Sequence, residues 1–298
     1  MSKKKNNIKN ILYITLFILS IYFSFFYRAA DWKRVKPYEN IEDYPAYSGR
    51  DSYEYWKTTL DDNQKILYEE MKEAYLQFIE WFSTDVKDIS EDDFQEVYAA
   101  VLLDHPEIFW MNSYQLRVNL LKQKNVNTGK KIRLFYYYNK DEAIEIKNRI
   151  EPKYKSIIEE ADKKENGDFD KILYVHDSLI NLAKYRDYTV EERKEFQNIV
   201  SIFDKGETVC AGYSYGFKFI MDQLGIDCVL VRDIDNVDED SNHIWNMVKY
   251  DDVWYNIDVT GDASLKNNEN GPIIYNFFMK DNEEFYKTHK MQENMPQN

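Results

Sequence analysis

The sequence predicts an α+β fold in which a helix that begins at a cysteine packs on an antiparallel sheet. Three observations lead to this fold class. Apolar residues recur at helical spacing in several segments before residue 225. Short β-branched or alternating runs are concentrated after residue 226. The dipeptide Asp251-Asp252 separates two of these runs at the spacing of a hairpin.

Cys210 opens the segment around which this fold is organised. Apolar residues follow it at positions 211, 215, 219, 220 and 224, and Gly225 then ends the predicted helix. Free backbone N–H groups and the positive end of the helix dipole favour a thiolate at a helix N-terminus. We therefore expect Cys210 to be a nucleophile.

A predicted hairpin brings a histidine and an aspartate together. Strands are expected at 226–231, 243–248 and 253–259, and the last two flank the turn at residues 251–252. Pairing about this turn places Asp258 within a residue or two of the position opposite His243. The carboxylate can then accept a hydrogen bond from one imidazole nitrogen while the other nitrogen faces the thiol.

The segments VCAGYS, HIWNMV and WYNIDVTGD resemble the cysteine, histidine and aspartate motifs of the transglutaminase-like superfamily of cysteine enzymes, in the same order and at similar spacing. The resemblance covers roughly residues 130–290, with weaker similarity at 105–110. It implies a papain-like cysteine-protease core with Cys210 as nucleophile, His243 as general base and acid, and Asp258 orienting the imidazole. Gly261 departs from the pattern, because many bacterial relatives carry tryptophan there.

The resemblance also implies a reaction. A cysteine triad of this kind transfers an acyl group from an amide through a thioester, and the substrate is a protein or peptide, with the cell wall as one setting. Water as acceptor gives proteolysis or deamidation, and an amine gives a cross-link. The alternative is a catalytically silent, anchored module that binds a peptide or a cell-wall component with the same fold.

Other interpretations of the same residues remain open. Cys210 and Cys228, the only two cysteines, could form a disulfide in an oxidising compartment. Cys210, His243 and Asp258 could ligate zinc, although no closely spaced ligand pair supports this. The acidic run after Arg232 does not fit a calcium-binding loop, because glycine and glutamate are missing at the required positions. We expect no cofactor and no metal.

Residues 1–36 predict a membrane anchor. Four lysines precede an uncharged run from Asn10 to Tyr27, which is at the short end of the about 17–25 residues that span a bilayer. The run exceeds the core of a cleaved signal peptide, and a small-residue cleavage site is lacking. We expect a single-pass N-terminal anchor with the C-terminal part outside the cell; a secreted protein is the alternative.

Charge excludes nucleic acid as a partner. The formal net charge is −14, and residues 37–298 hold 31 Lys and Arg against 52 Asp and Glu, a formal charge of −21. Such a surface repels nucleic acids. Three parts are predicted: the anchor and its flank at 1–36, a mainly helical region at 37–129, and the transglutaminase-like domain at 130–298.

The remaining predictions concern secondary structure and single residues. Ser90 and Asp93 form a capping-box pattern. His105 is interpreted as a helix-end residue, His176 as a packed, hydrogen-bonded residue and His289 as a surface residue. Tyr213 and Tyr215 are candidates for the rim of a substrate groove. Helices are expected at 53–83, 90–102, 142–163 and 169–185, and strands at 114–121, 131–138 and 273–279.

Overall fold

The computed structural model describes residues 50–84, 86, 89–112, 117–123, 126–189, 191–232, 243–266, 271–290 and 294–297. The predicted anchor at 1–36 and the acidic run 233–242 lie outside these ranges. Within the described ranges, none of the helices combines the length and apolarity needed to cross a bilayer.

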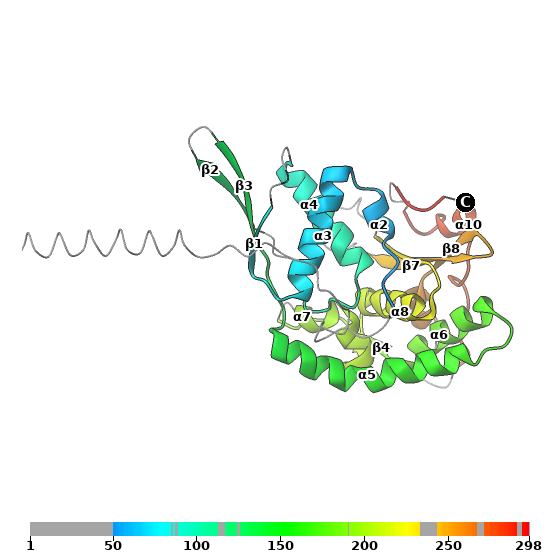
Figure 1. Ribbon diagram of the computed structural model, residues 1–298. Coiled ribbons are helices and arrows are strands. Elements are labelled where there is room, and N and C mark those ends of the chain that lie inside the picture. Colours follow the sequence, from blue (N-terminus) through cyan, green and yellow to red (C-terminus); the bar gives the residue numbers. More distant parts are fainter. Residues whose placement is uncertain are drawn as a thin grey trace, which may run out of the picture.

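Helices and strands are mixed along the chain, as the predicted α+β class requires (Figure 1). The elements in chain order are α2 (Tyr55–Thr58), α3 (Asp62–Leu76), β1 (Trp81–Thr84), α4 (Glu91–Asp104), β2 (Arg117–Gln123), β3 (Val126–Arg133), α5 (Lys140–Asp162), α6 (Asp168–Leu182), β4 (Lys184–Tyr185), α7 (Arg193–Phe196), the π-helical turn η2 (Ser201–Lys205), β5 (Glu207–Thr208), α8 (Cys210–Leu224), β6 (Cys228–Arg232), β7 (Ile244–Tyr250), β8 (Val253–Ile257), α9 (Val259–Ser264) and α10 (Asn282–Phe285).

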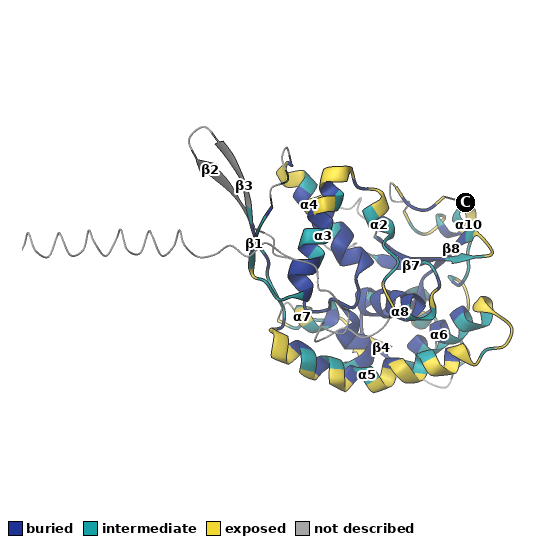
Figure 2. Cartoon of the chain, in the orientation of Figure 1, coloured by how far each residue is buried: buried dark blue, intermediate teal, exposed yellow. Residues whose placement is uncertain are grey.

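Helix α8 is the centre of the molecule. It packs against an antiparallel sheet of order β6-β7-β8, and α5 and α6 also contact it. Figure 2 shows α8 almost entirely buried, whereas α5 and α6 expose their outer faces. Gly225 ends α8 in the left-handed region at a φ of 72°, where glycine carries no side-chain penalty. The predicted helix from Cys210 to Gly225 and its packing on a sheet are thus present.

The N-terminal region is attached to this core by buried hydrogen bonds. The Trp56 indole donates to the Leu230 carbonyl at 2.9 Å. The Tyr53 N–H donates to Asp222 Oδ1, and the Tyr53 carbonyl accepts from Lys218 Nζ, both at 3.1 Å. Helices α3 and α4 pack against each other in this region (Figure 1). Residues 53–56 therefore connect the N-terminal helices directly to α8 and β6.

The predicted helix 53–83 is wrong in its extent. A capping box between Asp61 and Gln64 begins a separate helix, α3. This helix stops where Phe78 adopts a left-handed φ of 55°. Strand β1 follows and pairs antiparallel with β3, so pairing with a distant strand overrides the local helical pattern. The capping box of Ser90 and Asp93 at the start of α4 is present as predicted.

Two strand predictions also need correction. Strand β3 begins at Val126, five residues before the predicted start at 131, and ends at Arg133 rather than at residue 138. The segment 273–279 forms no strand, because the Asp262 carboxylate accepts the N–H groups of Asn276 at 2.8 Å and Phe277 at 2.9 Å. A side chain thus takes the backbone donors that a strand ladder would use.

Candidate active site

Cys210 is the first residue of α8 and is partly exposed, whereas the twelve residues after it are buried. Gly212 lies in the first turn of the helix. A Cβ atom at this position would overlap the hydroxyls of Ser201 and Thr208, which are hydrogen-bonded to each other at 2.6 Å. The small residues after the cysteine therefore let the first turn of α8 pack directly on the preceding segment, which fixes the position of the thiol.

His243 immediately precedes β7, and two hydrogen bonds hold β7 against α8. The Ser214 hydroxyl donates to the Ile244 carbonyl at 2.9 Å. The Asn246 amide donates to the Ser214 carbonyl at 3.0 Å. Because Ser214 lies one helical turn after Cys210, these bonds set the distance between the thiol and the imidazole.

Asp258 lies just after β8, at the N-cap of α9. Its Oδ2 is 2.8 Å from His243 Nε2, and the thiol of Cys210 is also a hydrogen-bond partner of this imidazole. The last pair of the β7–β8 ladder joins Asn246 and Ile257, so Asp258 lies two residues from the position opposite His243. The hairpin therefore brings the three predicted residues together in the order thiol, imidazole, carboxylate.

The charges of these groups depend on each other. Burial opposes a charged imidazole, but the hydrogen bonds and charges of Asp258 and Cys210 outweigh burial and raise the pKa of His243 to about 10. Burial also opposes a charged Asp258, yet His243 and His289 hold the pKa of this carboxyl well below its usual range. Asp258 is charged although only 2 % of it is exposed. Its hydrogen bond with His243 therefore requires a proton on Nε2 of the imidazole.

His289 belongs to this site, and its assignment to the surface is wrong. Its Nε2 is 3.3 Å from the same Asp258 Oδ2 that binds His243. The ring stacks on Phe285 with 3.9 Å between centroids, and only 10 % of the side chain is exposed. The acidic residues around it in the sequence concealed this position. The available signal was that the chain has only four histidines, each of which is a candidate for chemistry.

A second histidine network supports the segment beside the site. His176 is fully buried and bonded through Nδ1 to Asp177 at 2.9 Å and through Nε2 to Asp262 at 3.2 Å. The N–H of Asp258 in turn donates to the carbonyl of Phe277, whose own N–H binds Asp262. His176 is therefore the packed, hydrogen-bonded residue that the sequence predicts, and it anchors the chain segment that contacts Asp258.

Because Gly261 has no side chain, the ring of Phe277 can pack close to its backbone. A Cβ atom at Gly261 would lie 2.6 Å from Phe277 Cδ2 and 2.8 Å from Asp258 Oδ2. A tryptophan at this position would therefore displace Phe277. The Phe277 ring also lies edge-on to His289, with centroids 5.4 Å apart. Phe277 supplies part of the apolar surroundings of the carboxylate.

The other cysteine and two tyrosines are core residues. Both cysteines are free, and Cys228 is fully buried, where burial strongly raises the pKa of its thiol. The Cys210–Cys228 disulfide is not present. Tyr213 and Tyr215 are 0 % and 5 % exposed, so the prediction that they form a groove rim is wrong. Residues two apart point to nearly opposite sides of a helix, and both rings are buried because α8 is covered on all sides.

Tyr185 is the exposed aromatic residue next to the thiol. It is 51 % exposed and pairs with Thr208 through the short parallel strands β4 and β5, two residues before Cys210. Burial of the phenol and the nearby Cys210 together raise the pKa of Tyr185. The predicted helix 169–185 ends at Leu182, and this early end frees Tyr185 for the strand. The exposed ring of Tyr185 therefore lies beside the segment that leads into Cys210.

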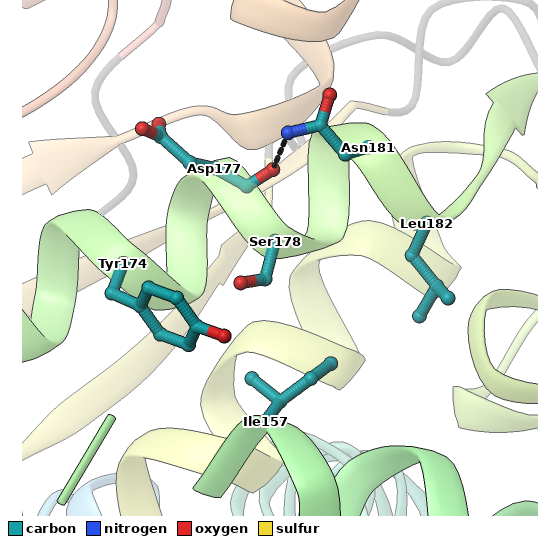
Figure 3. Close-up of a pocket in the computed structure, with 6 residues that line it drawn as sticks. All are labelled: Ile157, Tyr174, Asp177, Ser178, Asn181 and Leu182. Carbon is teal, nitrogen blue, oxygen red and sulfur yellow. Dashed lines mark hydrogen bonds between the residues drawn. The ribbon is translucent and has the colours of Figure 1, made fainter. Parts of the chain in front are cut away.

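A separate depression of about 390 Å³ lies between α5 and α6. Figure 3 shows Ile157 of α5 facing Tyr174 and Ser178 of α6 across it, with the Asn181 amide donating to the Asp177 carbonyl at 2.8 Å. None of its lining residues is Cys210, His243 or Asp258. The lining residues are Ile157, Tyr174, Asp177, Ser178, Asn181 and Leu182.

Comparison with known families bears on this arrangement. Residues 155–259 match the sequence model of the transglutaminase-like superfamily, a range that includes Cys210, His243 and Asp258. This segment therefore resembles the transglutaminase-like superfamily, and the rest of the chain lies outside the match. No curated protein sequence matches the chain significantly.

Three solved structures show weak similarity to this chain. A TGase is 17 % identical with a TM-score of 0.35 over 61 % of this chain and 50 % of its own. A protein assigned as a cysteine protease from Cytophaga hutchinsonii is 13 % identical with a TM-score of 0.30 over 49 % and 62 %. The periplasmic domain of TgpA from Pseudomonas aeruginosa, bound to ethylmercury, is 11 % identical with a TM-score of 0.28 over 49 % and 64 %. The chain thus spans half to under two thirds of these proteins.

Proposed function

We propose that this protein is a cysteine enzyme that transfers acyl groups from amides of proteins or peptides. The observation that supports this function best is the hydrogen-bonded series of Cys210, His243 and Asp258, with the thiol at the N-terminus of a buried helix. A nucleophile, a base and a residue that orients the base are the components that thiol acyl transfer needs.

In the first step, the Cys210 sulfur attacks the amide carbonyl and forms a C–S bond. The negative charge on the carbonyl oxygen is held by the free N–H of Cys210 at the start of α8. The imidazolium of His243 then protonates the leaving nitrogen, the C–N bond breaks, and a thioester and a free amine remain. Asp258 keeps the imidazole oriented throughout.

In the second step, His243 removes a proton from the acceptor, which attacks the thioester and regenerates the thiol. Water as acceptor completes hydrolysis, and a primary amine such as lysine completes a cross-link. The high pKa of His243, about 10, favours an imidazolium in the site before the substrate binds. Tyr185, exposed beside Cys210, is our candidate for the wall that contacts the substrate.

We also propose that the domain acts outside the cytoplasm, held by the N-terminal segment. The support is the sequence pattern of four lysines followed by the uncharged run Asn10–Tyr27. Fractionation of cells that express the full-length chain, followed by protease treatment of intact cells, tests this location. Recovery in the soluble cytoplasmic fraction would contradict it.

Thiol reactivity tests the enzymatic proposal. The full-length chain is treated with iodoacetamide from pH 5 to 9, and alkylation of each cysteine is followed by mass spectrometry. Cys210 is expected to react rapidly well below pH 8, and His243→Ala is expected to remove this advantage. Buried Cys228 is the internal control and stays unmodified. If Cys210 reacts like an ordinary thiol in both proteins, the chain is better explained as a binding module.

A further inference from the structure

Two imidazoles and one carboxylate lie close together in the candidate active site. Asp258 Oδ2 lies 2.8 Å from His243 Nε2 and 3.3 Å from His289 Nε2. One atom from each residue can be chosen so that all three lie within 4.8 Å of one another. The second oxygen of the carboxylate, Oδ1, is buried and has no hydrogen-bond partner among the described residues. The carboxylate therefore has unused capacity to bind a ligand.

Packing against three aromatic rings holds the His289 imidazole in place. Its ring stacks on Phe285 and lies edge-on to Trp245 at 5.2 Å and to Phe277 at 5.4 Å between centroids. Trp245 also stacks beside His243 at 6.0 Å. An apolar shell of this kind fixes the direction of imidazole nitrogens and limits competition from water.

We propose that His243, Asp258 and His289 form a binding site for zinc or a similar divalent cation, and that the bound ion inactivates the thiol. Two imidazoles and a carboxylate are ligands that zinc prefers, whereas magnesium and calcium prefer sites made of oxygen. Three protein ligands leave the fourth position of a tetrahedral ion to water.

The two distances from Asp258 Oδ2 to the imidazole nitrogens are close to the ligand spacing around such an ion. Tetrahedral zinc with bonds of about 2.0–2.1 Å separates its ligand atoms by about 3.3 Å. The distance from His289 Nε2 to Asp258 Oδ2 already has this value at 3.3 Å. The pair of His243 and Asp258, at 2.8 Å, needs to open by only about 0.5 Å to reach the same spacing.

The ion would act through the tautomer of His243. Nε2 is bonded to Asp258, which leaves Nδ1 as the imidazole nitrogen available to the Cys210 thiol. An imidazole that binds a metal through Nε2 carries its proton on Nδ1 and has no lone pair left to accept the thiol proton. Cys210 lies on the opposite edge of the ring and is not a ligand of this ion. This effect on the thiol rests on the proposed function, whereas the metal site itself does not.

Zinc binding by two variants tests the site without any catalytic measurement. Zinc is titrated by calorimetry into the full-length wild type, Cys210→Ser and His289→Phe, with magnesium in excess to occupy surface carboxylates. His289→Phe keeps the aromatic stacking on Phe285 but removes both nitrogens. We expect one zinc in the wild type and in Cys210→Ser, and at least a tenfold weaker affinity in His289→Phe.

Two results would overturn the proposal. Loss of binding in Cys210→Ser, with retention in His289→Phe, would place zinc on the thiol and Nδ1 of His243. Equal binding in all three proteins would place it on surface carboxylates. His289→Asn serves as a second variant, and thermal unfolding of each variant shows whether it is folded.

Alkylation of Cys210 then measures the consequence of binding. Saturating zinc is expected to slow alkylation at least tenfold in the wild type, with full recovery on addition of a chelator. In His289→Phe the ratio of the rates with and without zinc is expected to approach one. An equal effect of zinc on both proteins would show that the ion does not act through His289.

Discussion

Replacing Asp258 by asparagine removes the charge from the site while keeping the shape of the side chain. The carboxylate is 2 % exposed and bonded to His243 at 2.8 Å, so no water molecule can readily replace it. The asparagine amide can also donate to Nε2 of His243. That bond favours the imidazole tautomer that carries a proton on Nδ1. A protonated Nδ1 cannot accept the proton of the thiol.

The expected size of the effect follows from the pKa of His243. Burial lowers this pKa, but Asp258 and Cys210 raise it from 6.5 to about 10. The difference corresponds to about 5 kcal/mol in favour of the imidazolium, at about 1.4 kcal/mol for each pH unit. If Asp258 supplies half of this, its loss costs about 2–3 kcal/mol, which is about a 30- to 150-fold change in an equilibrium.

We therefore expect Asp258→Asn to shift the proton-transfer equilibrium between Cys210 and His243 by about 30- to 150-fold, and to slow iodoacetamide alkylation of Cys210 at pH 6.5 by more than about threefold. Nuclear magnetic resonance of ¹⁵N-labelled histidine reports the proton on His243 directly, and its pKa is expected to fall by about 2. The matched control is Asp252→Asn, the same substitution at a turn residue of the same hairpin whose side chain is 95 % exposed. It should alter neither quantity.

An alkylation rate for Asp258→Asn within threefold of the wild type, together with an unchanged titration of His243, would refute this reasoning. The thiol and imidazole would then form their pair without help from the carboxylate. Near-ultraviolet circular dichroism distinguishes this result from a loss of structure.

Three further predictions concern packing and pH. Gly261→Ala is expected to destabilise the fold by about 1–3 kcal/mol in urea, because its Cβ would lie 2.6 Å from the Phe277 ring; adding Phe277→Ala should recover part of the loss, and additive effects would contradict the clash. Lys218→Met is expected to lower the free energy of unfolding by about 3–5 kcal/mol, because it leaves Asp222 buried without the ammonium 3.1 Å away. The double variant with Asp222→Leu should be more stable than Lys218→Met alone. An equally unstable double variant would argue against an uncompensated charge. Burial lowers the pKa of His105, but its carboxylate partners raise this pKa to about 9. The contribution of His105 to stability is therefore complete below about pH 6.5 and is lost as the pH rises through about 9. Unfolding measurements from pH 6 to 10 should show this loss of stability in the wild type and a smaller loss in His105→Gln.

Local patterns in the sequence predicted the elements that carry the candidate site. The helix from Cys210 to Gly225 follows from apolar spacing and a terminal glycine, and the turn at Asp251-Asp252 follows from its composition. Both residues of that turn have positive φ values, 49° and 63°, which aspartate tolerates better than most residues. The antiparallel register then places Asp258 close to His243.

The prediction was wrong where distant segments compete for the same backbone or surface. Trp81–Thr84 reads as the end of a helix but pairs with β3, and residues 273–279 alternate like a strand but bind Asp262 through their N–H groups. Neither Asp262 nor β3 is a neighbour of these segments in the sequence. Periodicity describes only local preferences and cannot include such partners.

The sequence by itself determined which residues hold the thiol, the imidazole and the first carboxylate, because a capped helix and a tight hairpin are local structures whose side-chain directions follow from spacing. Only the tertiary structure decided that His289 joins Asp258 from 31 residues further along the chain. It also decided that Phe277 lies against Gly261, and that Tyr213 and Tyr215 are core residues while Tyr185 is exposed. These positions depend on which surfaces pack together, and packing is a property of the whole chain rather than of any one segment.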